Sequence, residues 1–170
     1  MVSWYRAEPL NPSTNWGPKP LTLREKIEGD IHDAMRRRDQ ARLDTLRYLK
    51  SAVLLVEKTR RKSLDDAGLV EIIAKQASDR RESIRMFEQG NRSDLVAKEA
   101  ADLAILEGYL PAPLTQEDLA QLIHSVIKEV GATSARDKGR VMGRLMPQLR
   151  GRAEGAQVNT LVTQILEPGG

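Results

Sequence analysis

The stretch TLREKIEGDIHDAMRRRDQARLDTLRYLKSAVLLV, residues 22–56, decides the fold class of this chain. Thr22 and Glu25 have the spacing of a capping box, a pattern that opens helices. Apolar residues then recur every four positions, and on a helix they form one face that we expect to be buried. These residues are Leu23, Ile27, Ile31 and Met35. The pattern predicts a first helix that ends near Arg38.

A second apolar series in the same stretch alternates spacings of three and four, which is typical of a coiled-coil-like seam. Its members are Leu46, Leu49, Val53 and Val56. Asp39 precedes the series and is the expected cap of a second helix that extends to about Thr59.

Two further helices follow at short intervals. Ser63 and Asp66 have capping-box spacing and open a third helix, which we expect to stop at Gly90. Ser93 is the expected cap of a fourth helix, up to Leu110. No run of alternating β-branched residues predicts a strand. Short links between four helices predict an antiparallel helical domain over residues 21–110.

The segment LPAPLT, residues 110–115, interrupts the helical pattern, since Pro111 and Pro113 are excluded from a helix interior. We expect the domain boundary here. Downstream, the sequence predicts helices over residues 115–130 and 135–146, and a last helix after the turn at residues 150–155. The prediction is an all-α fold, with a small three-helix C-terminal domain over residues 115–167.

Residues 1–20 differ from the rest, because they lack a helical period and hold both tryptophans and four of the eight prolines. We expect a mobile N-terminal extension. A start codon assigned too far upstream and a recognition role for the tryptophans are the alternatives.

The composition excludes several classes of site. The 170 residues include no cysteine, so disulfides, thiolate nucleophiles and zinc–thiolate centres are absent. His32 and His124 fall in different predicted domains without metal-ligand spacing, and we expect both to be solvated or interfacial. No catalytic residue, cofactor or metal is predicted. Because no apolar run has the length of a membrane span and no secretory signal is recognisable, we expect a cytoplasmic location and no membrane partner.

Positive charge is concentrated in one segment. Residues 21–110 hold 18 basic and 17 acidic residues, whereas residues 132–152 hold six basic residues and one acid. The six are Arg136, Lys138, Arg140, Arg144, Arg150 and Arg152. On a helix, the four-residue spacing of the first arginines forms a stripe suited to phosphate groups. A solvated basic face is the other interpretation. Gly139 and Gly143 lie in the same segment, where helix packing or close approach of an RNA backbone would explain them.

The stretch ARDKGRVMGRLMPQLRGRAEGAQVNTLVTQIL, residues 135–166, resembles the signature of the GatB/YqeY family. The segments LREKIEGDIHDAMRRRDQARLDTLRYLKSAV, RRESIRMFEQGNRSDL and EGYLPAPLT agree with it. The resemblance implies two α-helical domains, of which the second is similar to the tail domain of the B subunit of the aspartyl/glutamyl-tRNA amidotransferase.

That resemblance implies a tRNA-binding accessory protein of the tRNA-dependent amidotransferase or aminoacyl-tRNA system, with the six basic residues as the contacts to the tRNA backbone. It gives a structural role to Gly139, Gly143, Gly151, Gly155 and Asn159. Two alternatives remain: a helical adaptor for an amidotransferase or synthetase partner, and a subunit that contributes to a carbon–nitrogen ligase with glutamine as amido donor.

Overall fold

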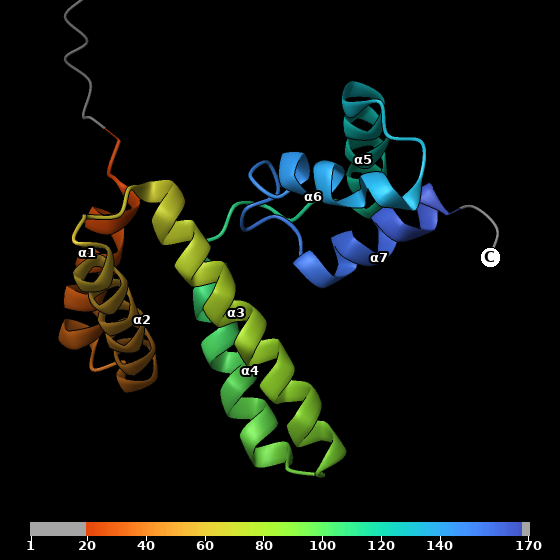
Figure 1. Ribbon diagram of the computed structural model, residues 1–170. Helices are drawn as coiled ribbons and strands as arrows, with labels where there is room; N and C mark the ends of the chain where they lie inside the picture. Colours follow the sequence, from red (N-terminus) through yellow and green to blue (C-terminus); the bar gives the residue numbers. More distant parts are fainter. Residues whose placement is uncertain (1–19, 168–170) are drawn as a thin grey trace, which may run out of the picture.

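The computed structural model describes residues 20–167, and these residues form helices and connecting segments without a strand (Figure 1). The all-α prediction is confirmed. The helices are α1 (Leu23–Arg37), α2 (Gln40–Arg60), α3 (Asp66–Gln89), α4 (Ser93–Glu107), α5 (Gln116–Val130), α6 (Lys138–Leu145) and α7 (Gly155–Leu166). A 3-10 turn, η1 (Ala135–Asp137), directly precedes α6. The expected N-terminal extension lies outside the described residues.

Side-chain caps define the starts of the first three helices. The capping box of α1 is confirmed, since Thr22 Oγ1 accepts from the Glu25 amide and Glu25 Oε2 accepts from the Thr22 amide, at 3.2 and 2.8 Å. Asp39 caps α2 as predicted. The predicted cap at Ser63 is wrong. Asp65 caps α3 instead, and its Oδ1 accepts from the Gly68 amide at 2.9 Å.

Helices α1 to α4, here called the N-terminal unit, share one hydrophobic core. Figure 1 shows α3 and α4 side by side as a long hairpin, with α1 and α2 packed near one end of it. The core includes Ile27, Ile31, Leu46, Leu49, Val53, Leu69, Ile73 and Leu106. Met35 was predicted to join it, but its side chain is 40% exposed. A helix has 3.6 residues per turn, so each step of four residues advances about 40° beyond a full turn. A series with this spacing gradually leaves the buried face, and Ala34 is therefore buried instead of Met35.

Helices α5, α6 and α7, here called the C-terminal unit, bury a second and separate core. Its residues include Leu119, Ile123, Val126, Val141, Leu145, Leu149, Val158 and Val162. Gly131 ends α5 in the left-handed region, with φ of 63°. The helix predicted over residues 135–146 is shorter, because its first three residues form the 3-10 turn. The division of the chain into two domains at residues 111–114 stays a prediction.

Candidate binding cleft between the helical units

Two hydrogen bonds, one of them from a side chain, fix the linker over residues 108–115 to the turn between α6 and α7. The Leu114 amide donates to the Arg152 carbonyl at 3.0 Å, and Arg152 Nε donates to the Ala112 carbonyl at 3.3 Å. The two segments are far apart in sequence. The contacts therefore place the turn over residues 147–154 beside the entry to the C-terminal unit.

Gly151 brings that turn against α3. Its φ is 70°, a left-handed conformation that side chains disfavour. A Cβ atom at this position would lie 2.6 Å from Cγ1 of Val70 and 3.1 Å from Cδ of Pro111. Glycine is thus required for two reasons at once, the left-handed backbone and the contact with Val70 of α3.

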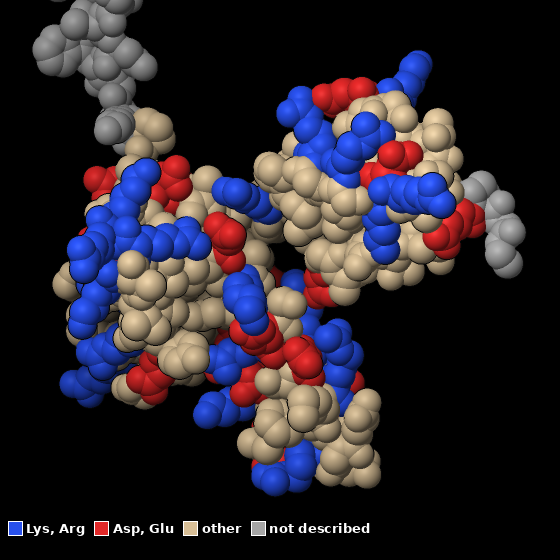
Figure 2. Space-filling view, in the orientation of Figure 1, with Lys and Arg blue, Asp and Glu red and all other residues tan. Residues whose placement is uncertain are grey.

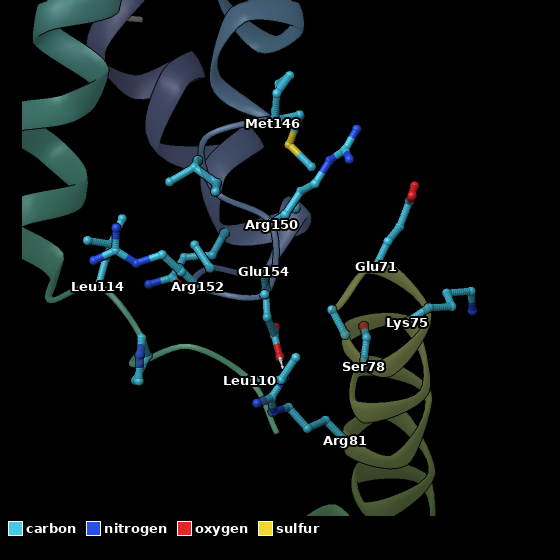
Figure 3. A pocket seen from close by; sticks show the side chains of 18 of the residues that line it. Glu71, Lys75, Ser78, Arg81, Leu110, Leu114, Met146, Arg150, Arg152 and Glu154 are labelled. Atoms are coloured by element: carbon cyan, nitrogen blue, oxygen red, sulfur yellow. Dashed lines mark ion pairs between the residues drawn. The ribbon is translucent and has the colours of Figure 1, made fainter. Parts of the chain in front are cut away.

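Two ion pairs of one arginine also join the N-terminal and C-terminal units. Arg81 of α3 contacts Glu107 of α4 at 2.6 Å and Glu154, the residue before α7, at 3.0 Å. Figure 3 marks the Arg81–Glu154 pair with a dashed line. One guanidinium group therefore joins α3, α4 and the C-terminal unit.

Between these two contacts lies a cleft of about 690 Å³. Figure 3 shows Glu71 and Lys75 of α3 on one side of it and Met146 and Arg150 on the other. Its apolar lining comes from both units and from the linker. These lining residues are Ala74, Leu110, Pro113, Leu114, Met146, Pro147, Leu149 and Ala153.

Arg150 is the cation of this cleft whose side chain has neither a carboxylate nor a hydrogen-bond partner in the described residues, since Arg152 donates to the Ala112 carbonyl. In the described part of the chain no carboxylate lies within 4 Å of its guanidinium group, whereas Lys75 pairs with Asp79 and Arg81 with two glutamates. Arg150 also borders a smaller cavity of about 360 Å³, together with Arg60 and Lys62 from the end of α2. The guanidinium group of Arg150 therefore has free N–H donors next to the apolar residues that line the cleft.

The cleft offers no metal site. Over residues 20–167, no group of three histidine, aspartate or glutamate side chains is placed to hold an ion. His32 and His124 are both exposed, as expected for solvated histidines.

The six basic residues predicted as one contact surface are not equivalent. Arg136 lies in η1, while Arg140 and Arg144 lie in α6 and pair with Asp137 and Glu129 at 2.7 and 2.6 Å. Arg150 and Arg152 lie in the cleft instead. Among the six, four have no carboxylate partner in the described residues: Arg136, Lys138, Arg150 and Arg152, of which Arg152 donates to the Ala112 carbonyl instead. The six do not form one continuous stripe of free charge, and their assignment as contact residues stays a prediction.

Asp137 anchors this region through backbone hydrogen bonds. Its Oδ2 accepts from the Thr133 amide at 3.0 Å, and its Oδ1 accepts from Arg140 at 2.7 Å. These bonds, the first above all, lower the pKa of the Asp137 carboxyl group. The single acid of the basic segment thus holds the start of α6 in place.

The glycines of the segment have different environments. A Cβ atom on Gly139 or Gly143 would meet nothing within 4 Å, so close helix packing among the described residues does not explain them. Gly151 shapes the turn, and Gly155 is the first residue of α7. Asn159 lies exposed one turn further along α7.

Sequence reasoning missed the α3 side of the cleft. Glu71, Lys75 and Arg81 belong to a helix whose charges read as an ordinary solvated face. Arg81 and Glu154 are 73 positions apart, so no local pattern connects them. The sequence feature most closely related to this side of the cleft is Gly151, to which the family resemblance gives a structural role. The sequence alone does not predict its contact with α3.

Comparison with known proteins identifies the family. The family described as Yqey-like protein matches residues 24–166, which include both helical units and the linker. The chain belongs to the YqeY-like family. The predicted resemblance is therefore confirmed for nearly the whole described chain.

Three proteins from fungi are similar to this YqeY-like chain. Altered inheritance of mitochondria protein 41, mitochondrial, from Pyrenophora tritici-repentis is 33% identical over 149 residues, covering 85% of this chain and 80% of the relative. Proteins of the same name from Kluyveromyces lactis and Saccharomyces cerevisiae are 35% and 31% identical. Those two matches cover 57% and 59% of this chain, and 55% and 56% of the relatives.

These relatives overturn two expectations. A tRNA-binding accessory role in the amidotransferase system is contradicted, because the matching proteins are named for the inheritance of mitochondria and nothing in the matches supports tRNA binding or amidation. The expectation of a cytoplasmic location is wrong for the same reason, since the relatives are mitochondrial proteins. The motif at residues 135–166 specifies a helical unit, and one fold serves many functions.

Proposed function

We propose that this chain works in mitochondria and supports their inheritance as a non-catalytic protein that binds an amphipathic anion in the cleft between its helical units. The observation that carries the proposal is the match to the Pyrenophora protein, which extends over 85% of this chain. A continuous match of that extent includes helices of both units and the linker between them. The junction therefore belongs to the part that the two proteins share.

The cleft supports the choice of ligand class. A volume of about 690 Å³ lies within the usual range for small-molecule sites. Met146 and Leu110 supply apolar contact for a hydrocarbon or ring, and Arg150 supplies a free guanidinium group for a carboxylate, sulfonate or phosphate. Glu71 on the opposite side repels a second negative group, so the anionic end of the ligand is directed toward Arg150.

Rescue of yeast tests the cellular role. In a Saccharomyces cerevisiae strain that lacks its own Altered inheritance of mitochondria protein 41, this chain is expressed behind a mitochondrial targeting leader. We expect the fraction of daughter cells that inherit functional mitochondria to return to the level of the parent strain. A vector without insert is the control. Expression of folded, imported chain without any rescue would contradict the proposal.

Binding of a model amphipathic anion tests the cleft directly. We expect the purified chain to enhance the fluorescence of anilinonaphthalene sulfonate with saturable binding. Arg150→Ser should weaken that binding at least about tenfold, since hydrogen bonds to charged groups contribute about 1.5–3 kcal/mol. Arg85→Ser removes an exposed arginine of α3 outside the cleft and serves as the matched control. Equal binding of the dye by Arg150→Ser and Arg85→Ser would show that the dye binds outside the cleft.

A further inference from the structure

We propose that the exposed face of α2 is a docking surface for an anionic lipid bilayer. We call this surface the α2 face, and it consists of Tyr48, Leu54, Leu55, Lys58, Arg61 and Lys62. The proposal goes beyond binding in the cleft, because the face lies on a different element and uses different residues.

The apolar part of the α2 face is solvent-exposed. The exposed fractions of Tyr48, Leu54 and Leu55 are 61%, 52% and 65%, although the residues between them on the other side of the helix are buried in the core. Tyr48 and Leu55 are spaced by seven, two helical turns, so they lie along one side. Leu54 and Lys58 are spaced by four and form the adjacent row, while Arg61 and Lys62 directly follow the end of α2 at Arg60. The leucines are therefore aligned with the cations that follow them.

The cations of the α2 face are free. No carboxylate lies within 4 Å of Lys58, Arg61 or Lys62 in the described part of the chain. Glu57, the single acid between Ser51 and Lys62, points away and is bound to Arg24 at 2.5 Å and to the Leu64 amide at 2.7 Å. Figure 2 shows blue side chains gathered along the outer border of the α1–α2 hairpin, beside a tan surface.

An anionic bilayer satisfies both halves of this surface. Exposed leucines insert at the boundary between headgroups and acyl chains, while lysine and arginine side chains remain with the anionic headgroups. A nucleic acid would engage the cations but leave the leucines in water. Charge complementarity and exposed apolar area together therefore favour lipid.

The mode of association is peripheral. Among residues 20–167, no helix has the length and apolar character needed to cross a bilayer. The expectation of no membrane partner rests on the lack of a spanning segment. A helix that lies on the bilayer surface with one apolar side needs no such segment.

Vesicle co-sedimentation of the full chain tests the proposal. We expect binding to vesicles of equal parts phosphatidylcholine and phosphatidylglycerol, and little binding to phosphatidylcholine alone. Lys58→Gln with Lys62→Gln should weaken binding about 25-fold, since each basic residue near an anionic surface contributes about 1 kcal/mol. Leu54→Ser with Leu55→Ser should weaken it at least about tenfold through lost apolar burial.

Matched controls distinguish vesicle binding by the α2 face from nonspecific adsorption of the chain. Met86→Ser removes an apolar side chain that is also 65% exposed, but at the far end of α3, and Lys98→Gln removes a cation of α4. Both should bind as the unmodified chain does, and so should Arg150→Ser. Circular dichroism of each variant confirms folding before the comparison.

Two results would overturn the proposal. Equal binding to neutral and anionic vesicles would remove the role of the cations. If the lysine variant loses binding while the leucine variant binds as the unmodified chain does, the surface is a general polyanion site, such as one for nucleic acid. Since the cleft variant is expected to bind vesicles normally, failure here is distinguishable from failure of the proposed function.

Discussion

Glu57 is the residue whose charge contributes most clearly to the fold of the α2–α3 turn. Its Oε1 accepts from the Leu64 amide at 2.7 Å and from Arg24 at 2.5 Å. The amide bond first, and then Arg24, lower the pKa of this carboxyl group. A folded-state pKa below the unfolded value gives a stabilisation that is complete above the unfolded pKa, about 4.3 for glutamate, and is lost as pH falls through the folded pKa.

We therefore expect Glu57→Gln to lower the free energy of unfolding at pH 7, with a difference from the unmodified chain that shrinks as the pH falls from 5 to 3. Urea unfolding at several pH values measures this difference. Glu82→Gln, at an exposed position of α3, is the matched control and should change little. A Glu57→Gln deficit that is the same at pH 7 and pH 3 would show that the charge is irrelevant.

At single residues, the sequence predicted caps and buried positions well where the cause is local. Thr22 and Asp39 cap their helices because a side-chain oxygen next to free amides is a local arrangement. The prediction of Ser63 failed because two possible caps, Ser63 and Asp65, precede α3 and tertiary contacts decide where the helix begins. Asp66, its first residue, accepts from the Leu23 amide at 3.1 Å. A local sequence pattern cannot predict a contact between residues that are 43 positions apart.

At the scale of elements, the turn between α6 and α7 has the sharpest requirement. Gly151→Ala places a Cβ atom against Val70 in a conformation that costs an L-residue roughly 1–2 kcal/mol before any clash. We expect a loss of at least that amount in the free energy of unfolding, measured with urea. Hydrogen exchange should rise at the linker and around Val70, because the turn must move away from α3.

Gly139→Ala is the control for this prediction. Its Cβ atom would meet no atom within 4 Å, and its φ is not in the left-handed region. Alanine is the better helix former by up to about 1 kcal/mol, so this variant should be equally or more stable than the unmodified chain. A Gly151→Ala variant as stable as Gly139→Ala would contradict the described approach of the turn to α3.

The existence and order of the elements followed from hydrophobic period, prolines and glycines, because these act over a few residues. The sixth helix was predicted to extend to residue 146, and α6 ends at Leu145, two residues before Pro147. The 3-10 start of that helix was missed. Asp137 accepts from the Thr133 amide and ties the chain into a tighter turn before α6 begins.

At the scale of the whole molecule, the prolines predicted the interruption between α4 and α5, but nothing in the sequence predicted the cleft beside it. The cleft needs α3 and the α6–α7 turn in contact, and its bridge joins Arg81 to Glu154. The charge count grouped Arg150 and Arg152 with the basic residues of the preceding helix as one contact surface, because it lacked the path of the chain. Family resemblance predicted the fold correctly and the function wrongly, since relatives with one fold differ in what they do.

The most direct test of the central claim is the yeast inheritance assay with two arginine variants. Arg150→Glu reverses the free cation of the cleft, and Arg85→Glu makes the same change on an exposed part of α3 outside it. The account predicts that chain with Arg85→Glu restores inheritance of functional mitochondria as the unmodified chain does, whereas Arg150→Glu, expressed and folded to the same level, restores little of it. Full rescue by Arg150→Glu would contradict the assignment of the cleft as the functional site.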